Sequence, residues 1–440
     1  MITPMQNHYK QTAIGEIPNS WDIKQLQEVA DFSNGYAFSS RSFVNSKNDA
    51  VPVFKMGNIG IDGGLKITGK EDYASLVIAE KLKNYLTREN DILMCMTDMK
   101  SSMNLLGHSA RIHNEKFLVN QRVGIIRPRT NVDASYLYYY LNSPKYIERL
   151  RTTARSGVQV NLTTEAIRES QVLCPAQEEQ HQIAAILSSL DDKIELNRKM
   201  NKTLEEMGNA LFKRWFVDFE FPDENGKSYK STGGEMVESE LGEIPISWKI
   251  VEINDFGKIV CGKTPPKSNH KYFGGNIPFI KIPDMHGRMF VIKTEDTLTS
   301  DGADYQKNKT LPKGSICVSC IATVGLVCII TQDSQTNQQI NSIIPNNSHY
   351  KEYLYFVLSS MTKQLQDFAS GGSATLNLNT GSFSNIPMLS PSYDLLAKFH
   401  SVAELIFEQV VLKAMENEKL SAIRDSLLPR LMNGKLRVKK

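Results

Sequence analysis

The segment Gly15-Glu16-Ile17-Pro18-Asn19-Ser20-Trp21 returns later in the chain as Gly242-Glu243-Ile244-Pro245-Ile246-Ser247-Trp248, an offset of 227 residues. Further pairs of segments repeat in the same order, with offsets that shrink stepwise from 226 to 216: Val51–Lys55 with Ile277–Lys281, Asn120-Gln121 with Asn337-Gln338, Tyr136–Tyr138 with Tyr353–Tyr355, and Asn161-Leu162 with Asn377-Leu378. Chance matches would not keep this order, and we therefore interpret the chain as an internal duplication.

Each half begins with a globular part, in which short apolar runs are separated by Gly, Asn and Pro. Runs such as Val51–Phe54, Val123–Ile126 and Ile316–Val318 predict strands that are joined by turns. The stretch Ala134–Leu141 predicts a helix. The sequence therefore predicts a mixed α/β domain in each half.

Each half ends in a long predicted helix, because apolar residues recur there at alternating spacings of three and four. This spacing is the period of a coiled coil, and about 38 helical residues span roughly 57 Å. The predicted seam between the helices consists of Ile183, Leu187, Leu190, Ile194, Asn201, Leu204 and Leu211 in the first half, and of Phe399, Ile406, Val410, Asn417, Leu420 and Leu427 in the second.

A helix of this length cannot bury its seam against one small domain. We expect the two helices to pack together antiparallel, with one globular domain at each end of the pair. Pro429 is expected to end the second helix. The repeat-equivalent Asn201 and Asn417 are expected to face each other and fix the register, the alternative being that both are solvated.

The predicted fold class is therefore α+β, with two mixed α/β domains joined by two long helices that form an antiparallel coiled-coil spacer. The internal repeat predicts a pseudo-two-fold relation between the halves. The expected boundaries are residues 1–176 for the first domain, 177–219 for the central helix, 220–241 for an acidic linker, 242–392 for the second domain, and 393–440 for the final helix and tail.

The composition is that of a globular protein of the cytoplasm. Apolar residues make up 41% of the 440 residues and charged residues 22%, which excludes a disordered chain. We find no apolar run of about eighteen residues and no signal peptide, so neither a membrane span nor secretion is expected. Six cysteines do not form a disulfide framework in a chain of this length. The net charge of +3 does not by itself indicate nucleic-acid binding.

Several motifs resemble those of the specificity subunit of type I restriction-modification systems. The stretches that carry the resemblance are Cys174–Gln180, followed by Ile183–Leu187, at the start of the central helix, Leu190–Asn197 and Leu211–Phe219 in the central region, Leu427–Gly434 in the tail, and Cys261–Pro265 near the start of the second domain. One departure is Pro391-Ser392-Tyr393-Asp394, which stands where that family has a second Glu-Gln motif.

The resemblance implies that each domain is a target recognition domain, which reads one half of a bipartite asymmetric site in double-stranded DNA. It implies that two modification subunits dock on the helices, bring S-adenosylmethionine and methylate adenine. Restriction subunits that use ATP and Mg would complete this phage-defence complex. The chain itself would hold no cofactor and no metal, and it would have no catalytic residues.

Two rival functions are compatible with parts of the sequence. Gly257–Thr264 matches the P-loop pattern of an ATP-binding enzyme, but Pro265-Pro266 is a poor helix start, and a P-loop needs a helix there. Cys317, Cys320 and Cys328 hint at zinc, yet no second ligand pair completes a tetrahedral site. Buried apolar cysteines are the favoured interpretation of these three residues.

The second rival function, besides an ATP-binding enzyme, is a duplicated protein scaffold that does not bind DNA.

Candidate DNA-reading residues are polar side chains in loops between apolar runs, because Arg or Lys reads guanine and Asn or Gln reads adenine. In the first domain they are Lys55, Asn58, Asp98, Lys100, Ser101, Ser102, Gln121 and Arg122. In the second domain they are Lys263, Thr264, Lys281, Asp284, Thr323, Gln338 and Gln339. For each residue, the alternative is an exposed side chain or a structural turn.

Overall fold

The computed structural model describes residues 9–44, 48–61, 63–67, 69, 71–101, 103–155, 159–370 and 376–438. The chain forms two compact units. Unit 1 consists of Met1–Lys193 and Leu420–Lys440, and unit 2 consists of Ile194–Lys419. Each unit therefore combines one globular domain with segments of both long helices. Among the helices of the described residues, none is long and apolar enough to cross a membrane.

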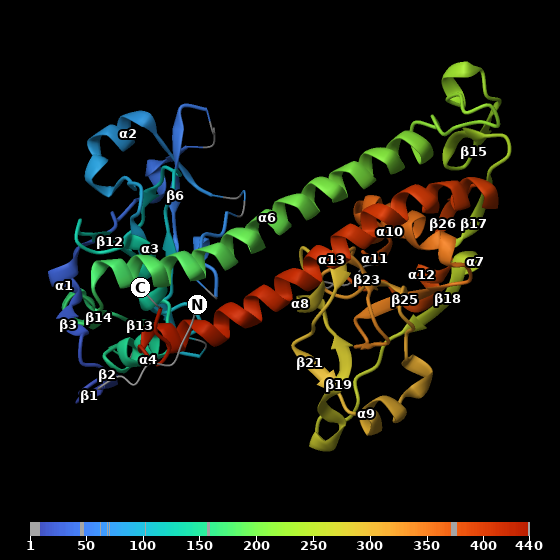
Figure 1. The fold of residues 1–440 in the computed structure, drawn as a ribbon. Helices are drawn as coiled ribbons and strands as arrows, with labels where there is room; N and C mark the ends of the chain where they lie inside the picture. The colour runs from blue at the N-terminus through green and yellow to red at the C-terminus, as the bar shows by residue number, and fades with distance from the viewer. Residues whose placement is uncertain are drawn as a thin grey trace. The chain divides into compact units, whose positions relative to one another are not determined.

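The globular part of unit 1 is built on two four-stranded sheets (Figure 1). One is antiparallel, in the order β10-β8-β12-β4, and the other has the order β11-β6-β7-β5 with a parallel pair, β11 and β6. Its strands are β1 (Tyr9–Thr12), β2 (Gly15–Pro18), β3 (Asp22–Gln25), β4 (Ala30–Asn34), β5 (Phe43–Val44), β6 (Ala50–Phe54), β7 (Tyr73–Ser75), β8 (Ile92–Cys95), β9 (Thr97–Met99), β10 (Ser109–Arg111), β11 (Leu118–Val119), β12 (Val123–Pro128), β13 (Gln159–Asn161) and β14 (Gln171–Cys174). Its short helices are α1 (Leu26–Val29), α2 (Leu76–Lys81), α3 (Ala134–Leu141), α4 (Pro144–Thr152) and α5 (Thr164–Arg168).

The globular part of unit 2 has a five-stranded sheet, β18-β25-β22-β23-β20, and a three-stranded sheet, β21-β19-β24 (Figure 1). Its strands are β15 (Met236–Ser239), β16 (Gly242–Pro245), β17 (Lys249–Glu252), β18 (Gly257–Cys261), β19 (Phe273–Ile280), β20 (Phe290–Val291), β21 (Asp296–Leu298), β22 (Ile316–Ser319), β23 (Val327–Ile330), β24 (Gln335–Thr336), β25 (Ile340–Pro345) and β26 (Pro387–Ser390). Its short helices are α7 (Ile253–Phe256), α8 (Ile282–Met285), α9 (Ser300–Asp304), α10 (Lys351–Ser360), α11 (Thr362–Ala369) and α12 (Thr380–Ser384).

The two domains share one topology. Strands β4, β12, β8 and β10 are neighbours in that order in unit 1, and β18, β25, β22 and β23 follow the same order in unit 2. The parallel pair of β11 with β6 likewise corresponds to the parallel pair of β24 with β19. Matching strands lie at the offsets of the sequence repeat, so the repeated segments build the same framework twice.

The predicted long helices are α6 (Gln177–Phe216) and α13 (Tyr393–Met432), each of 40 residues. The prediction that Pro429 ends the second helix is wrong, because α13 continues to Met432. Proline lacks a backbone N–H donor, and its ring clashes with the carbonyl group four residues earlier. Close to a helix end this loss affects little of the helix, and Asn433 N still donates to Pro429 O at 3.3 Å.

In unit 2 the segments of the two helices run antiparallel. Asn197 Nδ2 donates to Asn417 Oδ1 at 2.9 Å, and Asn201, further along α6, donates to the carbonyl of Val410, which lies earlier on α13. The predicted pairing of Asn201 with Asn417 is therefore wrong, since Asn417 meets Asn197. Repeat-equivalent residues of antiparallel helices face each other only midway along the pair, and Asn201 and Asn417 lie to opposite sides of that point.

All residues of the predicted seam are buried or partly buried. The fully buried ones are Ile183 and Leu187 in unit 1 and Ile194, Phe399 and Val410 in unit 2. The partly buried ones are Leu190, Leu420 and Leu427 in unit 1, and Asn201, Leu204, Leu211, Ile406 and Asn417 in unit 2. An apolar stripe thus follows each helix.

In unit 1 a polar cluster links the domain to both helices. The Asp191 carboxylate on α6 accepts from the Tyr139 hydroxyl of α3 at 2.7 Å and from Arg424 Nη1 of α13 at 2.8 Å. Burial alone would lower the pKa of the Arg424 guanidinium, but the Asp191 and Asp425 carboxylates raise it above its usual value. Arg424 therefore remains positively charged beside these two carboxylates.

Candidate nucleic-acid interface

Each unit carries the same tight turn between two strands. In unit 1 the backbone N–H of Arg122 donates to the Asn120 side-chain oxygen at 3.4 Å, and in unit 2 that of Gln339 donates to Asn337 Oδ1 at 3.1 Å. An asparagine that accepts from the backbone two residues ahead forms an Asx turn. We call Asn120–Arg122 and Asn337–Gln339 the Asx turns of the two units.

A glycine packs against the backbone of each Asx turn. A Cβ atom on Gly35 would lie 2.2 Å from Asn120 O, and one on Gly262 would lie 2.2 Å from Asn337 O. No other residue fits so close to a carbonyl. Gly262 belongs to the segment that matches the P-loop pattern. The close contact with the turn explains why a glycine stands at this position, without a bound phosphate. Strand β18 fills the first part of that segment, and no helix follows it.

In unit 1 the structure brings two of the predicted clusters together. Gln121 and Arg122 are exposed in the Asx turn, and Arg122 O accepts from Met96 N at 3.1 Å. Strand β9, which begins at the next residue, pairs with β13 and places Met99 opposite Gln159. Arg122 Nη1 donates to Gln159 Oε1 at 2.8 Å. The loop after Asp98 and the Asx turn therefore meet at Gln159.

Gln159 was missed by the sequence interpretation. A signal was present, because Gln159 lies two positions before Asn161, which matches Asn377 in the repeat. In unit 2 the corresponding residues are also close: Cys320 N donates to Gln339 O at 2.8 Å, and Ile321 forms a β-bridge with Asn377.

In unit 2 the Asx turn lies beside the predicted pair Lys263-Thr264. Thr264 Oγ1 donates to Gln338 Oε1 at 2.8 Å, and Lys263 Nζ lies 5.7 Å from the ring centre of Tyr305. Gln339 is less available for contact with DNA, because its side-chain oxygen accepts from Asn337 Nδ2 at 2.9 Å. Lys263, Thr264 and Gln338 thus form one polar surface, and Tyr305 is a neighbour that the sequence did not indicate.

The predicted residues Lys55 and Asn58 have internal roles. Asn58 is buried, and its side-chain oxygen accepts from Lys55 N at 2.8 Å. The Lys55 ammonium is paired with Asp72. These contacts hold the turn after β6, and base contact by these two residues stays a prediction.

Lys281 and Asp284 repeat this arrangement in unit 2. Buried Asp284 accepts from Lys281 N at 2.8 Å, and Lys281 Nζ pairs with Asp296 at 2.7 Å. The hydrogen bond to Asp296 raises the pKa of Lys281. The lysine is therefore a paired cation, and DNA reading by this pair also stays a prediction.

The remaining candidates surround the loop after β9 and its counterpart. Asp98 is buried and accepts from Met99 N and Leu105 N, both at 2.7 Å, so it shapes the loop. Lys100, Ser101 and Thr323 are exposed, whereas the prediction for Ser102 lies outside the described residues.

A sequence model of the type I restriction modification DNA specificity domain matches residues 18–206 and 245–393 of the chain. The two matches cover most of each globular domain, including its Asx turn. The chain belongs to the family of type I restriction-modification specificity subunits.

Similarity to individual relatives supports this family assignment. The HindI specificity subunit of Haemophilus influenzae is 40% identical over 375 residues, which span 73% of this chain and 82% of the relative. The MjaIX specificity subunit of Methanocaldococcus jannaschii is 26% identical over 449 residues, 98% of this chain and 97% of that protein. The crystal structure of a type I S subunit from M. genitalium matches with a TM-score of 0.58 at 17% identity, covers 97% of this chain and 99% of that one, and supports the fold alone.

The chain is thus a DNA specificity subunit, the non-catalytic component of a type I restriction-modification system. Its fold, two mixed α/β domains with two long helices packed together, is the predicted one. Within the described part of the chain, no group of three or more His, Cys, Asp or Glu side chains could hold a metal ion. Cys317 and Cys328 lie opposite each other on β22 and β23 and are buried.

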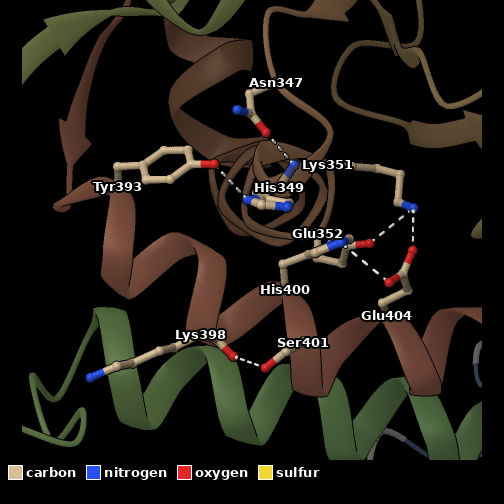
Figure 2. A network of polar contacts seen from close by, with 9 residues as sticks. All are labelled: Asn347, His349, Lys351, Glu352, Tyr393, Lys398, His400, Ser401 and Glu404. Carbon is tan, nitrogen blue, oxygen red and sulfur yellow. Dashed lines mark hydrogen bonds and ion pairs between the residues drawn. The ribbon is translucent and has the colours of Figure 1, made fainter.

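The motif departure of this specificity subunit at residues 391–394 has a structural counterpart. At the start of α6, Gln180 accepts from Asp133 N at 3.0 Å, and His181 contacts the Asp133 carboxylate. At the start of α13, the Tyr393 hydroxyl lies 3.1 Å from His349 Nδ1 (Figure 2). A different set of side chains therefore joins the second long helix to its domain.

The cluster in Figure 2 is centred on Glu352, whose side chain is fully buried. Lys351 Nζ lies 3.0 Å from one Glu352 oxygen, and His400 Nδ1 lies 2.7 Å from the other. His400 Nε2 also reaches Glu404 at 3.2 Å, and its ring stacks on His349. Lys351 and His400 thus both contact a buried carboxylate where α10 meets α13.

Replacing Lys351 by Met should lower the stability of the chain, because it removes one partner of a buried carboxylate. Breaking such a pair costs about 3 kcal/mol or more. The double variant Lys351→Met/Glu352→Gln should lose less stability than Lys351→Met alone, since no buried charge is left uncompensated. Denaturant unfolding of unit 2, followed by Trp248 fluorescence in a variant with Trp21 and Trp215 replaced by Phe, measures the difference.

The matched control is Lys398→Met, because Lys398 is exposed on α13, the helix that carries His400, and its side chain points away from the cluster in Figure 2. This variant should unfold like its parent. If the double variant were less stable than Lys351→Met, the buried charge would not be the reason for the loss.

Proposed function

We propose that each globular domain reads one half of a bipartite, asymmetric site in double-stranded DNA, and that the paired helices set the distance between the half-sites. The observation that carries this proposal is the Asx turn, which has the same backbone in both units but presents different side chains. A duplicated framework suits two half-sites, and different side chains suit unequal sequences.

The exposed apolar residues of the long helices support docking of two modification subunits. Leu196 on α6 and Leu412 on α13 are 51% and 58% exposed, and they lie at equivalent positions of the repeat. Met207 and Ile423, also exposed, form a second equivalent pair. Positions eleven residues apart lie on one face of a helix. Each helix therefore presents a similar apolar face, which fits two copies of one partner.

We further propose that these modification subunits bind S-adenosylmethionine and methylate adenine, and that restriction subunits with ATP and Mg complete the assembly in the cytoplasm. The chain would then supply sequence recognition alone. The competing function, a duplicated scaffold that binds only proteins, shares the apolar helix faces but requires no exposed polar turn in either domain.

The methylome of a methylation-free host that produces this chain with its cognate modification subunit tests the proposal. We expect a gapped, asymmetric motif with methyladenine on both strands, which disappears when this chain is left out. Single-molecule sequencing reads the motif directly. A stable complex that yields no motif would favour the scaffold.

Lengthening the spacer should change the gap and nothing else. Seven residues inserted into each helix, after Met200 in α6 and after Met415 in α13, keep the seam in phase and add about 10 Å. That length corresponds to about three base pairs at 3.4 Å each. The methylome should show a longer gap between unchanged half-sites, and a change in either half-site would contradict the role of the helices.

Charges placed on the apolar helix faces should reduce the number of bound modification subunits. Leu196→Glu or Leu412→Glu should each lower the stoichiometry from two to one, because each replaces one apolar contact by a charge. Mass photometry of the purified complex gives the count. Thr203→Glu, at an exposed polar position of α6, adds the same charge as a control and should leave two bound. Loss of both partners in either single variant would refute independent docking.

A further inference from the structure

The two Asx turns differ in a single side chain. The turn of unit 1 reads Asn120-Gln121-Arg122, and the turn of unit 2 reads Asn337-Gln338-Gln339. Both are held by the same asparagine contact and by a glycine packed on the turn carbonyl. Because the backbone is shared, the change from arginine to glutamine alters the chemistry of the turn without altering its shape.

Arg122 is held by a neutral partner. Its guanidinium donates to the neutral amide oxygen of Gln159 at 2.8 Å, and among the described residues no carboxylate lies within ion-pair distance of it. Arg127, on the strand β12 that follows, and Arg129, just beyond that strand, are instead paired with Asp91 and Asp31. An amide can direct the guanidinium, yet it leaves the positive charge uncompensated.

The contact with Gln159 uses one of the five N–H donors of the guanidinium. Arg122 and Gln159 are both exposed, so further donors can reach a ligand outside the protein. A planar fork of donors matches the O6 and N7 acceptors of guanine in the major groove, and this is the commonest specific contact between a side chain and a base. Glutamine, at the equivalent position of unit 2, lacks this fork.

We propose that Arg122 determines specificity for a guanine in the half-site read by unit 1, and that Gln159 is the positioning residue that aims its guanidinium. The proposal rests on the function proposed above and adds the base and the residues that select it. A phosphate contact would need the charge but not the direction, and the fixed amide partner is therefore the feature that favours base reading.

The test compares the complex of this chain with its modification subunit on duplexes in which each position of the unit 1 half-site is replaced in turn. In Arg122→Gln, discrimination for guanine at one position should fall by about 5- to 150-fold, the range for one bidentate contact. The unit 2 half-site should be read as before. Lys116→Gln removes an equal charge from an exposed site of unit 1 and should leave discrimination unchanged.

Gln159 is tested with two variants, one that keeps a hydrogen-bond acceptor and one that removes it. Gln159→Glu keeps an acceptor for Arg122 and should retain the guanine preference, whereas Gln159→Leu removes the acceptor and should reduce it. A purely structural role would move both variants together through stability, which melting curves measure, and it would not change the ratio between two bases at one position.

The outcomes separate the two proposals. If the unaltered complex shows no sequence preference, the proposed function fails. If it has a preference and Arg122→Gln weakens binding equally on every duplex, Arg122 is a phosphate contact and the inference is overturned. Unchanged discrimination in a folded Arg122→Gln complex overturns it as well.

Discussion

The rest of this structure depends on the need to cover the apolar stripe of a helix that is 40 residues long. A single small domain cannot cover a helix of that length, and an exposed seam would promote aggregation. Duplication solves the problem, because the same chain supplies a second helix with a matching stripe. Each compact unit then contains parts of both helices, so the helices belong to the internal structure of the units.

Polar residues within this apolar packing make contacts from one long helix to the other. Asn197 is fully buried between α6 and α13 and donates to both Asn417 and Glu416. Asp191 and Arg424 form the corresponding contact in unit 1. Such groups contribute little net stability, but they penalise any shift of one helix along the other, since a shifted pair would leave them buried without partners.

The sequence predicted the features that follow from periodicity and repetition. The coiled-coil spacing predicted both long helices, and the repeated segments, which keep their order in the two halves, predicted two similar domains. The register was harder, because the stripe alone does not say which residues of two antiparallel helices meet, and Asn417 therefore has Asn197 as its partner. Composition rules for DNA reading selected Lys55, Asn58, Lys281 and Asp284, but could not reveal that these polar side chains are used in turns and ion pairs. Gln159 was missed for a different reason, since strand pairing brings it beside Arg122 from 37 positions away.

The Asx turns separate the residues that hold the backbone from the residues that face outward. Asparagine and glycine hold the backbone of the turn. Under the proposed function, selection can therefore act on the next two positions while that backbone stays the same. An arginine codon of the CGA or CGG type becomes a glutamine codon through one nucleotide change. If Arg122 reads a base as proposed, a population could acquire a new recognition specificity in a single mutational step.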